Sequence, residues 1–126
     1  MNTETTLLRQ VHPSFVQQGQ ASSQAFHPTL KDQKRLSVYD GDQISPDDAY
    51  EHYTTTLSLA SVGVMGVSVA ECRQCELTVR PDPEEFPEHV LVDFSGYSEN
   101  EIKKKAKQLK AFANHRGWLY RFNGGP

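Results

Sequence analysis

The stretch 61-SVGVMGVSV-69 decides the fold class, because apolar residues occupy both of its alternating sets of positions. One set holds Val62 and Val64, and the other holds Met65 and Val67. Side chains of a strand point alternately to the two faces of a sheet, so this pattern predicts a strand that is covered on both faces. A sheet with a layer on each side is therefore expected.

Other short stretches have the alternation or the β-branched content of strands. They are TLLRQV (6–11), the weaker QASSQAF (20–26), RLSVYD (35–40), ELTVRP (76–81), HVLVDF (89–94) and WLYRF (118–122). In 35–40, Leu36 and Val38 share one face, and Ser37 and Tyr39 share the other. Most connections are too short for a helical crossover, so antiparallel or mixed pairing is expected.

Two amphipathic helices are expected to cover this sheet. The first begins at Pro46 after the capping residue Ser45 and runs to about residue 55. The second follows the capping box of Ser98 and Glu101, spans 101–115 and stops at Gly117. The sequence thus predicts an α+β fold in a single compact domain.

A chain of 126 residues is the length of one domain. We expect a flexible tail over 1–5, an α+β domain over 6–122 and a second flexible tail over 123–126. No apolar run approaches the roughly 20 residues of a membrane span, and the first residues lack the basic start and long apolar core of a signal peptide. A cytoplasmic protein that does not engage a membrane is therefore expected.

Charge is distributed unevenly along the chain. Residues 1–101 have a net charge of −10, whereas residues 102–126 hold seven bases and no acid. The basic segment offers a candidate surface for nucleic acid or for a partner protein, made of Lys103, Lys104, Lys107, Lys110 and Arg116, with Trp118 and Tyr120 close behind. The same lysines are also typical of the solvated face of an amphipathic helix, and the acidic remainder would repel a polyanion. An acidic partner, or a basic partner for the acidic loop 82–88, is the alternative.

Cys72 and Cys75 form a C-x-x-C pair, which can bind zinc or perform redox chemistry. Zinc needs four ligands, and no second pair follows at the usual spacing. A redox dithiol should open a long helix, whereas a strand follows here almost at once. The sequence therefore predicts two thiols in a turn over 70–75, with no metal site and no cofactor.

Motifs of nucleophilic catalysis and phosphate binding are absent. No G-x-S-x-G elbow occurs, and the five histidines have no spacing that ties one of them to a serine or a cysteine. Gly63 and Gly66 lie inside an apolar strand, where close packing explains them.

The stretch 12-HPSFVQQGQASSQAFHP-28 contributes to a candidate pocket made of Arg9, His12, Ser22, Ser23, His27, Tyr39 and Asp40. An arginine on a first strand and serines on a later one resemble the motifs with which ADP-ribosyltransferase-like folds hold a nicotinamide dinucleotide. That family also requires a late catalytic glutamate, and the acids Glu84, Glu85 and Glu88 lie in a proline-rich loop without its spacing. In the alternative interpretation the two His-Pro pairs only end strands.

Nearly the whole chain resembles a family of small bacterial proteins that have no assigned activity. The resemblance rests on LLRQVHPSFV, SSQAFHPTLKD, RLSVYDGDQIS, VGVMGVSVAEC, PDPEEFPEHVLVDF and RGWLY. It implies a stand-alone bacterial domain and transfers no functional residue. We therefore expect a bacterial binding or accessory protein that acts through a macromolecular partner, and its oligomeric state is left open. A nucleotide- or NAD-processing enzyme with a site around Arg9, His12 and Ser22 is the second hypothesis, and a nucleic-acid binder is the third.

Overall fold

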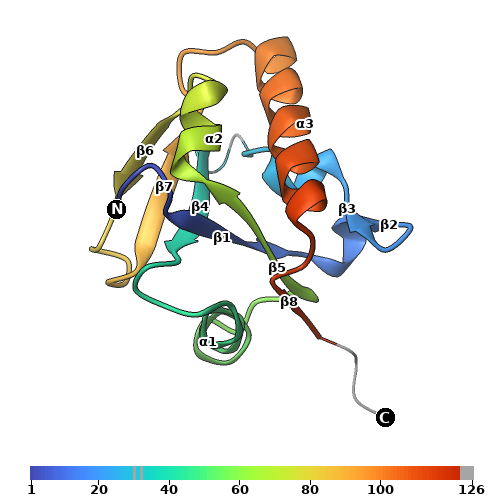
Figure 1. The fold of residues 1–126 in the computed structure, drawn as a ribbon, viewed down its shortest axis with the longest axis vertical. Coiled ribbons are helices and arrows are strands. Elements are labelled where there is room, and N and C mark those ends of the chain that lie inside the picture. Colours follow the sequence, from blue (N-terminus) through green and yellow to red (C-terminus); the bar gives the residue numbers. More distant parts are fainter. Residues whose placement is uncertain (30, 32, 123–126) are drawn as a thin grey trace.

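The framework of the structure is a six-stranded sheet with the strand order β6-β7-β4-β1-β5-β8, and every neighbouring pair in it is antiparallel (Figure 1). A hairpin, β2-β3, lies outside this sheet. The structure is a computed structural model that describes residues 1–29, 31 and 33–122. The prediction of a single compact α+β domain is confirmed.

The strands are β1 Thr6–Val11, β2 Val16–Gln17, β3 Gln20–Ala21, β4 Arg35–Asp40, β5 Gly63–Ser68, β6 Thr78–Pro81, β7 His89–Asp93 and β8 Tyr120–Arg121. The α-helices are α1 Pro46–Glu51, α2 Val69–Gln74 and α3 Glu99–Arg116. Three short helical turns complete the described chain: η1 Pro13–Phe15, η2 Ser23–Phe26 and η3 His52–Thr56.

Strand β5 pairs along its whole length with β1 and is covered on both faces, as its sequence predicts. Val64 packs in the cluster beside α1, whereas Met65 and Val67 belong to the main core on the other face. At Gly66 an added Cβ would lie only 2.7 Å from Cγ2 of Thr6 on β1. Glycine at this position lets the Thr6 side chain lie close to β5, and a larger residue would require neighbouring side chains to shift.

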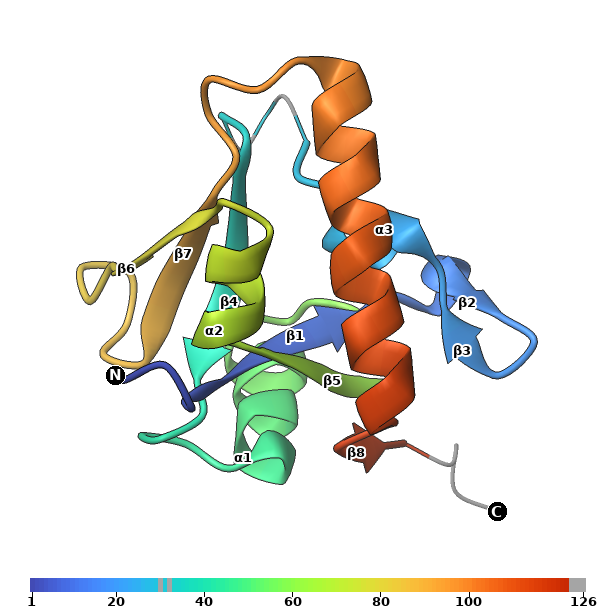
Figure 2. The same cartoon turned by 45° about the horizontal axis from the view of Figure 1, so that its top comes forward.

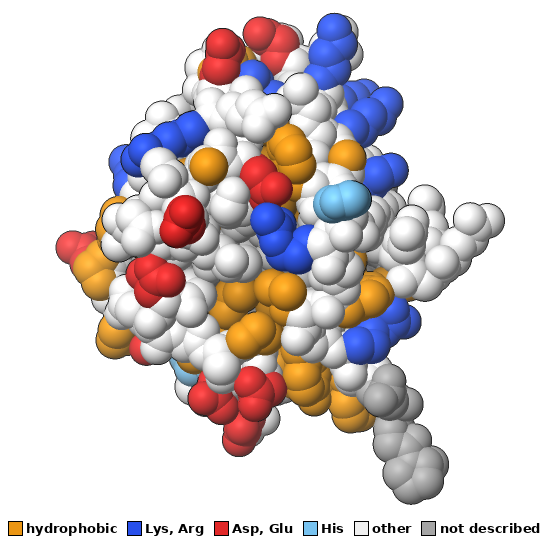
Figure 3. Space-filling view, in the orientation of Figure 1, with side chains coloured by type: hydrophobic (Ala, Val, Ile, Leu, Met, Phe, Trp, Pro, Cys, Tyr) orange, Lys and Arg blue, Asp and Glu red, His pale blue; other side chains and the backbone are white. Residues whose placement is uncertain are grey.

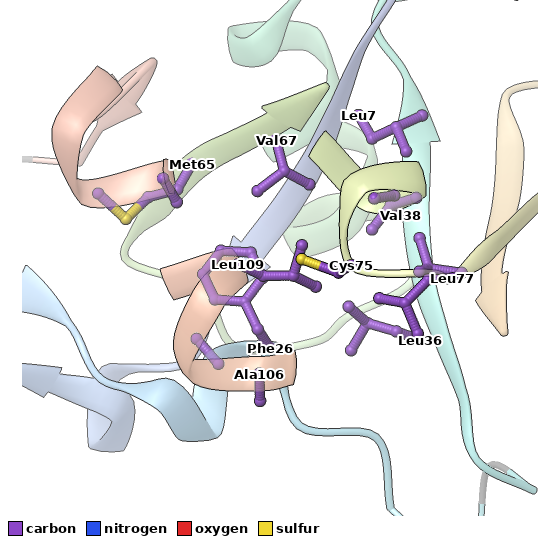
Figure 4. Close-up of a cluster of buried hydrophobic side chains, with 14 of the residues drawn as sticks. Leu7, Phe26, Leu36, Val38, Met65, Val67, Cys75, Leu77, Ala106 and Leu109 are labelled. Carbon is purple, nitrogen blue, oxygen red and sulfur yellow. The ribbon is translucent and has the colours of Figure 1, made fainter. Parts of the chain in front are cut away.

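Helices α2 and α3 and the turn η2 cover one face of the sheet, and the main core lies beneath them (Figure 2). Phe26 of η2 and Leu109 of α3 are fully buried and belong to the same cluster as Met65 and Leu36 (Figure 4). Each side chain of this size contributes about 1.5–3 kcal/mol when it is removed from water. This layer therefore supplies much of the stability of the fold.

Helix α3 begins and ends where the sequence indicates. The hydroxyl of Ser98 accepts from the backbone N–H of Glu101, and the Glu101 carboxylate accepts from the backbone N–H of Ser98. Gly117 ends the helix with a φ of 88°, which a residue with a Cβ rarely adopts. The apolar stripe that faces the sheet consists of Ile102, Ala106, Leu109 and Ala113, all buried.

Two segments differ from the prediction. Residues 69–74 form α2 instead of a turn, because Ser68 and Glu71 make a second reciprocal capping box. The apolar alternation of β5 continues to the first helical residue, and this hides the boundary in the sequence. The stretch 20–26 is a strand only over its first two residues, and it then becomes η2, which buries Phe26 under α3.

The opposite face of the sheet is covered only in part. Helix α1 contacts β5, β1 and β8, and it encloses a smaller cluster formed by Leu8, Tyr39, Ala49 and Val64. Ser45 caps this helix, and Tyr50 packs its ring 4.7 Å from that of Tyr120. On the same face, the cavity described below lies over β4, β7 and β6.

The N-terminal segment predicted as a tail makes hydrogen bonds with the domain. The Thr5 hydroxyl donates to the Asp42 carboxylate over 2.6 Å, and the backbone carbonyl of Thr5 accepts from Val69 N. The predicted tail at 123–126 lies outside the described residues. No helix in the described part of the chain combines the length and the apolar character that crossing a membrane requires.

Candidate functional site

A cavity of about 730 Å³ lies on the incompletely covered face of the sheet. Strands β4 and β7, the end of β6 and the following loop form its floor and one wall, and η3 with the residues after it forms another wall. Ser37 and Tyr39 reach this face because side chains alternate along β4, as the sequence predicts.

Cross-strand pairing arranges this face of β6, β7 and β4 in three rows, which include the cavity floor, since partners in an antiparallel pair point to the same face. Written from β6 through β7 to β4, the rows are Thr78, Asp93 and Arg35; then Arg80, Leu91 and Ser37; and then Asp82, His89 and Tyr39. Asp82 directly follows β6, and its backbone N–H donates to the carbonyl of His89. The register therefore places a serine diagonally next to a histidine.

Ser37, His89 and Asp82 form a continuous hydrogen-bonded chain. Oγ of Ser37 lies 3.1 Å from Nε2 of His89, and Nδ1 of His89 lies 3.0 Å from Oδ2 of Asp82. Ser37 is exposed to the cavity, whereas His89 is only 6 % exposed. A serine, a base and a group that orients the base are the three parts of an activated nucleophile.

The surroundings of His89 determine which ring nitrogen carries its proton. Nδ1 faces two oxygens of Asp82, the carboxylate at 3.0 Å and the backbone carbonyl at 3.2 Å, and both can only accept. In the neutral imidazole Nδ1 is therefore the donor, and Nε2 accepts from the Ser37 hydroxyl. This tautomer is the one that can take a proton from Ser37.

An aromatic cluster holds the imidazole in place. The ring of Phe86 lies 4.9 Å from His89, 5.0 Å from Tyr39 and 4.7 Å from His52. Tyr39 Oη is 2.8 Å from Nδ1 of His52. Burial, with smaller contributions from Tyr53 and Glu88, raises the pKa of Tyr39 well above its usual range, so this phenol stays neutral.

Arg9 bridges β1 and β4 beside the cavity. The paired residues of these strands are Leu7 with Asp40 and Leu8 with Tyr39. Beyond them, Nη1 of Arg9 donates to the carbonyl of Ser37 over 2.9 Å, and its Nε donates to Ala25 of η2 over 2.6 Å. The guanidinium thus links η2 on the covered face to the backbone of Ser37.

Gln10 lies next to Ser37 on the adjacent strand. If the register that pairs Leu8 with Tyr39 is continued, Gln10 lies opposite Ser37, and Gln10 also lines the cavity. It is only 5 % exposed; its Oε1 accepts from Ser61, and its Nε2 has no hydrogen-bond partner in the described part of the chain. If the side-chain amide of Gln10 is flipped by 180°, its Oε1 has no hydrogen-bond partner instead of its Nε2. One polar atom of this buried side chain is therefore unsatisfied among the described residues, and it has almost no surface open to the cavity.

The far row, together with Arg80 of the middle row, has an excess of positive charge. Asp93 lies opposite Arg35 in the strand register, and its Oδ2 is 3.6 Å from Nη2 of Arg80. Burial opposes the ionisation of Asp93, but hydrogen bonds from Ser95 and the charges of Arg80 and Arg35 hold its pKa below the usual value. One carboxylate thus faces two guanidinium groups.

The structure places the residues of the predicted pocket in different parts of the fold. Arg9 and Tyr39 line the cavity. His12 is exposed at the start of η1, where its Nδ1 lies 2.8 Å from the hydroxyl of Ser14. Asp40 is buried, and its carboxylate accepts hydrogen bonds from the turn that follows β4, so it holds that turn in place.

The remaining predicted residues, Ser22, Ser23 and His27, lie in η2 or directly beside it, under α3 on the opposite face of the sheet. Ser23 and His27 line a second cavity of about 400 Å³, and Nε2 of His27 is 2.9 Å from a carboxylate oxygen of Glu99. Ser22 is buried, and its hydroxyl has no partner among the described residues. These serines are therefore not brought together with Arg9 in one cavity.

The predicted basic surface lies on α3, where lysine and arginine side chains gather along the outer side of the helix (Figure 3). Its exposed lysines are Lys103, Lys104 and Lys107. Lys110 is half-buried. Arg116 pairs with the Glu71 carboxylate over 2.9 Å and donates to the carbonyl of Gly66, so its charge is balanced within the domain.

Cys72 and Cys75 are free and buried in α2 and at its end. Burial, with Cys75 and Glu71 adding to the effect, raises the pKa of the Cys72 thiol to about 12. Burial also raises the pKa of Cys75, against the opposing charge of Lys105. Such thiols stay protonated at neutral pH, which is the inert condition of a cysteine. Within the described ranges, no three histidine, cysteine or acidic side chains gather as metal ligands.

Sequence reasoning did not single out Ser37, His89 or Asp82. They come from three segments of the chain, and no fixed spacing links them. Two signals were present: Ser37 shares the outward face of its strand with Tyr39, and His89 begins a strand that follows an acidic loop. The strand order and the register, which the sequence does not specify, were needed to combine them.

Comparisons with known proteins give no family to which the chain can be assigned. No family model, no curated protein and no solved structure matches it. The function is therefore inferred from the geometry of the site.

Proposed function

We propose that the protein hydrolyses esters at the large cavity, with Ser37 as nucleophile, His89 as general base and Asp82 as the residue that orients the imidazole. The observation that carries the proposal is the hydrogen-bonded chain of these three side chains at the cavity wall. Such a triad is recognised by the geometry and the roles of its residues. Its three members can therefore lie far apart in the sequence.

The reaction proceeds in two balanced steps. Oγ of Ser37 attacks the ester carbonyl while its proton passes to Nε2 of His89; the carbon–oxygen bond to the alcohol then breaks as His89 returns the proton to the leaving oxygen. Water next attacks the acyl group on Ser37 and gives a proton to His89. The acid leaves, and the proton returns to Ser37. Asp82 stabilises the imidazolium in both steps.

We infer that the amide of Gln10 turns toward the cavity to donate to the oxygen that becomes negative during attack. Gln10 lies opposite Ser37 in the continued register and has one polar atom without a partner among the described residues. A donor aimed at this oxygen often makes a large contribution to catalysis. Arg9 acts through the backbone: it holds the carbonyl of Ser37 and is a positioning residue.

The test is hydrolysis of p-nitrophenyl butyrate together with labelling by a fluorophosphonate, which reacts with activated serines. We expect turnover and a single adduct on Ser37, both abolished in Ser37→Ala and His89→Ala. Ser14→Ala is the matched control, because Ser14 also contacts a histidine, His12, but outside the cavity. Absence of turnover and of an adduct in the wild type would refute the proposal.

We further propose that the exposed lysines of α3 bind an acidic macromolecular partner, as the sequence predicts. The supporting observation is that Lys103 and Lys107 line the second cavity beside Phe15, so cationic and apolar surfaces adjoin there. Arg116 takes no part in this proposal, since Glu71 balances its charge.

A further inference from the structure

We propose that the ester cleaved at Ser37 carries a carboxylate at the end of its acyl chain, and that Arg35 binds this carboxylate. The inference rests on the ester hydrolysis proposed above and adds the class of substrate. Arg35 and Ser37 lie two residues apart on one face of β4, so their Cα atoms are about 7 Å apart and a short acyl chain spans the two rows.

The proton path fixes which part of the ester points toward Arg35. His89 must return its proton to the leaving alcohol, so the alcohol lies on the side of the row that contains His89 and Tyr39. The acyl chain then extends across Ser37 in the opposite direction. The next row in that direction holds Arg35 and Asp93.

The charges of that row match a single carboxylate. The far row and its neighbour place the guanidinium groups of Arg35 and Arg80 around one carboxylate, that of Asp93. One positive charge is left over, which a singly charged carboxylate balances. Among the described residues that line the cavity, basic side chains, Arg9, Lys31, Arg35 and Arg80, outnumber the acidic ones, Asp82 and Glu85.

The Arg35 side chain is also held in position. Its Nη2 donates to the side-chain oxygen of Gln33, so part of the guanidinium fork is fixed before any ligand arrives. Arginine presents a planar fork that can bind both oxygens of a carboxylate at once. Fixing the fork in advance lowers the entropy cost of binding.

Apolar side chains also line the cavity. Leu91 lies opposite Ser37 in the strand register and therefore on the cavity floor. Leu57 and Leu59, which follow η3, line the cavity with 37 % and 48 % of their surfaces exposed. Leucines left exposed at a cavity wall provide a surface for the methylene groups of an acyl chain.

The experiment compares mono-p-nitrophenyl adipate with p-nitrophenyl hexanoate, which has the same chain length and no carboxylate. We expect kcat/KM to be about tenfold higher for the adipate ester, the effect of one charge-assisted hydrogen-bonded pair. In Arg35→Gln the ratio should fall to about one. Arg73→Gln removes an equal charge from the exposed surface of α2 and should keep both the ratio and the turnover of hexanoate.

The outcomes separate this inference from the function on which it rests. Equal rates for the two esters with Ser37-dependent turnover, or a preference that survives Arg35→Gln, would overturn the carboxylate site and leave the hydrolysis standing. If neither ester is cleaved, the proposed hydrolysis fails. Monomethyl adipate is then titrated into Ser37→Ala protein and followed by NMR: saturable binding that Arg35→Gln removes supports the site, and its absence overturns it.

Discussion

At the scale of single residues, Asp82 offers His89 two acceptors, a carboxylate and a backbone carbonyl. The two oxygens act on the His89 imidazole in different ways. The carbonyl fixes the tautomer of the imidazole and cannot be removed by mutating the side chain. The carboxylate adds the negative charge that stabilises the imidazolium during the reaction. Substitution of Asp82 should therefore test the charge alone.

Asp82→Asn should lower kcat by about 10²–10³-fold and leave KM nearly unchanged, because the charge acts in the transition state more than in the bound substrate. The measurement is steady-state hydrolysis of p-nitrophenyl butyrate, with Glu84→Gln as a control on the same loop. A loss as large as that of Ser37→Ala would show that the carbonyl does not hold the tautomer.

Gln10→Met should change stability and activity in opposite directions. It removes a buried polar atom that has no partner, and the Ser61 hydroxyl that donates to Gln10 keeps the Gly63 carbonyl as an acceptor, so the free energy of unfolding should rise by about 1 kcal/mol, while kcat should fall by about 10²-fold. Urea denaturation and ester hydrolysis provide the two measurements. A variant that loses stability and keeps its activity would show that the amide is structural.

Stability should decline at high pH because of Cys72. An unfolded thiol ionises near pH 8.5, whereas the folded one keeps its proton up to its pKa of about 12. The unfolded state therefore loses a proton that the folded state retains, and the stabilisation, complete below about pH 8.5, falls by about 1 kcal/mol per pH unit above it. Urea denaturation between pH 8 and 10 should give a shallower slope for Cys72→Ala. Equal slopes would contradict a buried, neutral thiol.

At the scale of elements, reciprocal caps define where α2 and α3 begin. The box of Ser98 and Glu101 was evident in the sequence, since polar residues and a turn precede it. The box of Ser68 and Glu71 directly follows a strand. The sequence pattern therefore did not indicate the start of a helix there.

Ser98→Ala should lower the free energy of unfolding by about 1 kcal/mol, since the backbone N–H of Glu101 loses the hydroxyl that accepts its hydrogen. Asn100→Ala, one residue inside the same helix turn and exposed, is the matched control and should change stability little. The comparison is made by urea denaturation at neutral pH. Equal effects of the two substitutions would argue against the cap.

Alternation along the chain was enough to predict which residues share a face, and the structure agrees for β4 and β5. It could not predict neighbours across strands, because local patterns do not specify strand order. Ser37 and His89 are 52 residues apart and meet only because β4 pairs with β7 in one particular register. The fold class was therefore predictable from the sequence, and the site was not.

At the scale of the whole molecule, the two candidate sites lie on opposite faces of the sheet. The cavity of Ser37 opens on the face that α1 covers in part, and the exposed lysines belong to α3 on the other face. A large partner could therefore dock on α3 without blocking the cavity.

Binding of a single-stranded oligonucleotide to the lysine face should be weak and electrostatic, because the domain before residue 102 has a net charge of −10. Fluorescence anisotropy should show affinity that falls with salt, and each of Lys103→Gln and Lys107→Gln should lower the slope by about one. Arg116→Gln should alter the slope less, since Glu71 neutralises Arg116. Binding that persists unchanged at high salt would contradict this account.

The pairing of β1 with β4 is short and joins two blocks of the sheet, β6-β7-β4 and β1-β5-β8. Two residue pairs, the hydrogen bond from Gly41 N–H to the Thr6 carbonyl and the guanidinium of Arg9 link the blocks. The triad lies wholly on one block, whereas Gln10 lies on the other, so a small rotation of the blocks would change the distance between Ser37 and Gln10. The geometry of the proposed site would then depend on a junction to which Arg9 contributes.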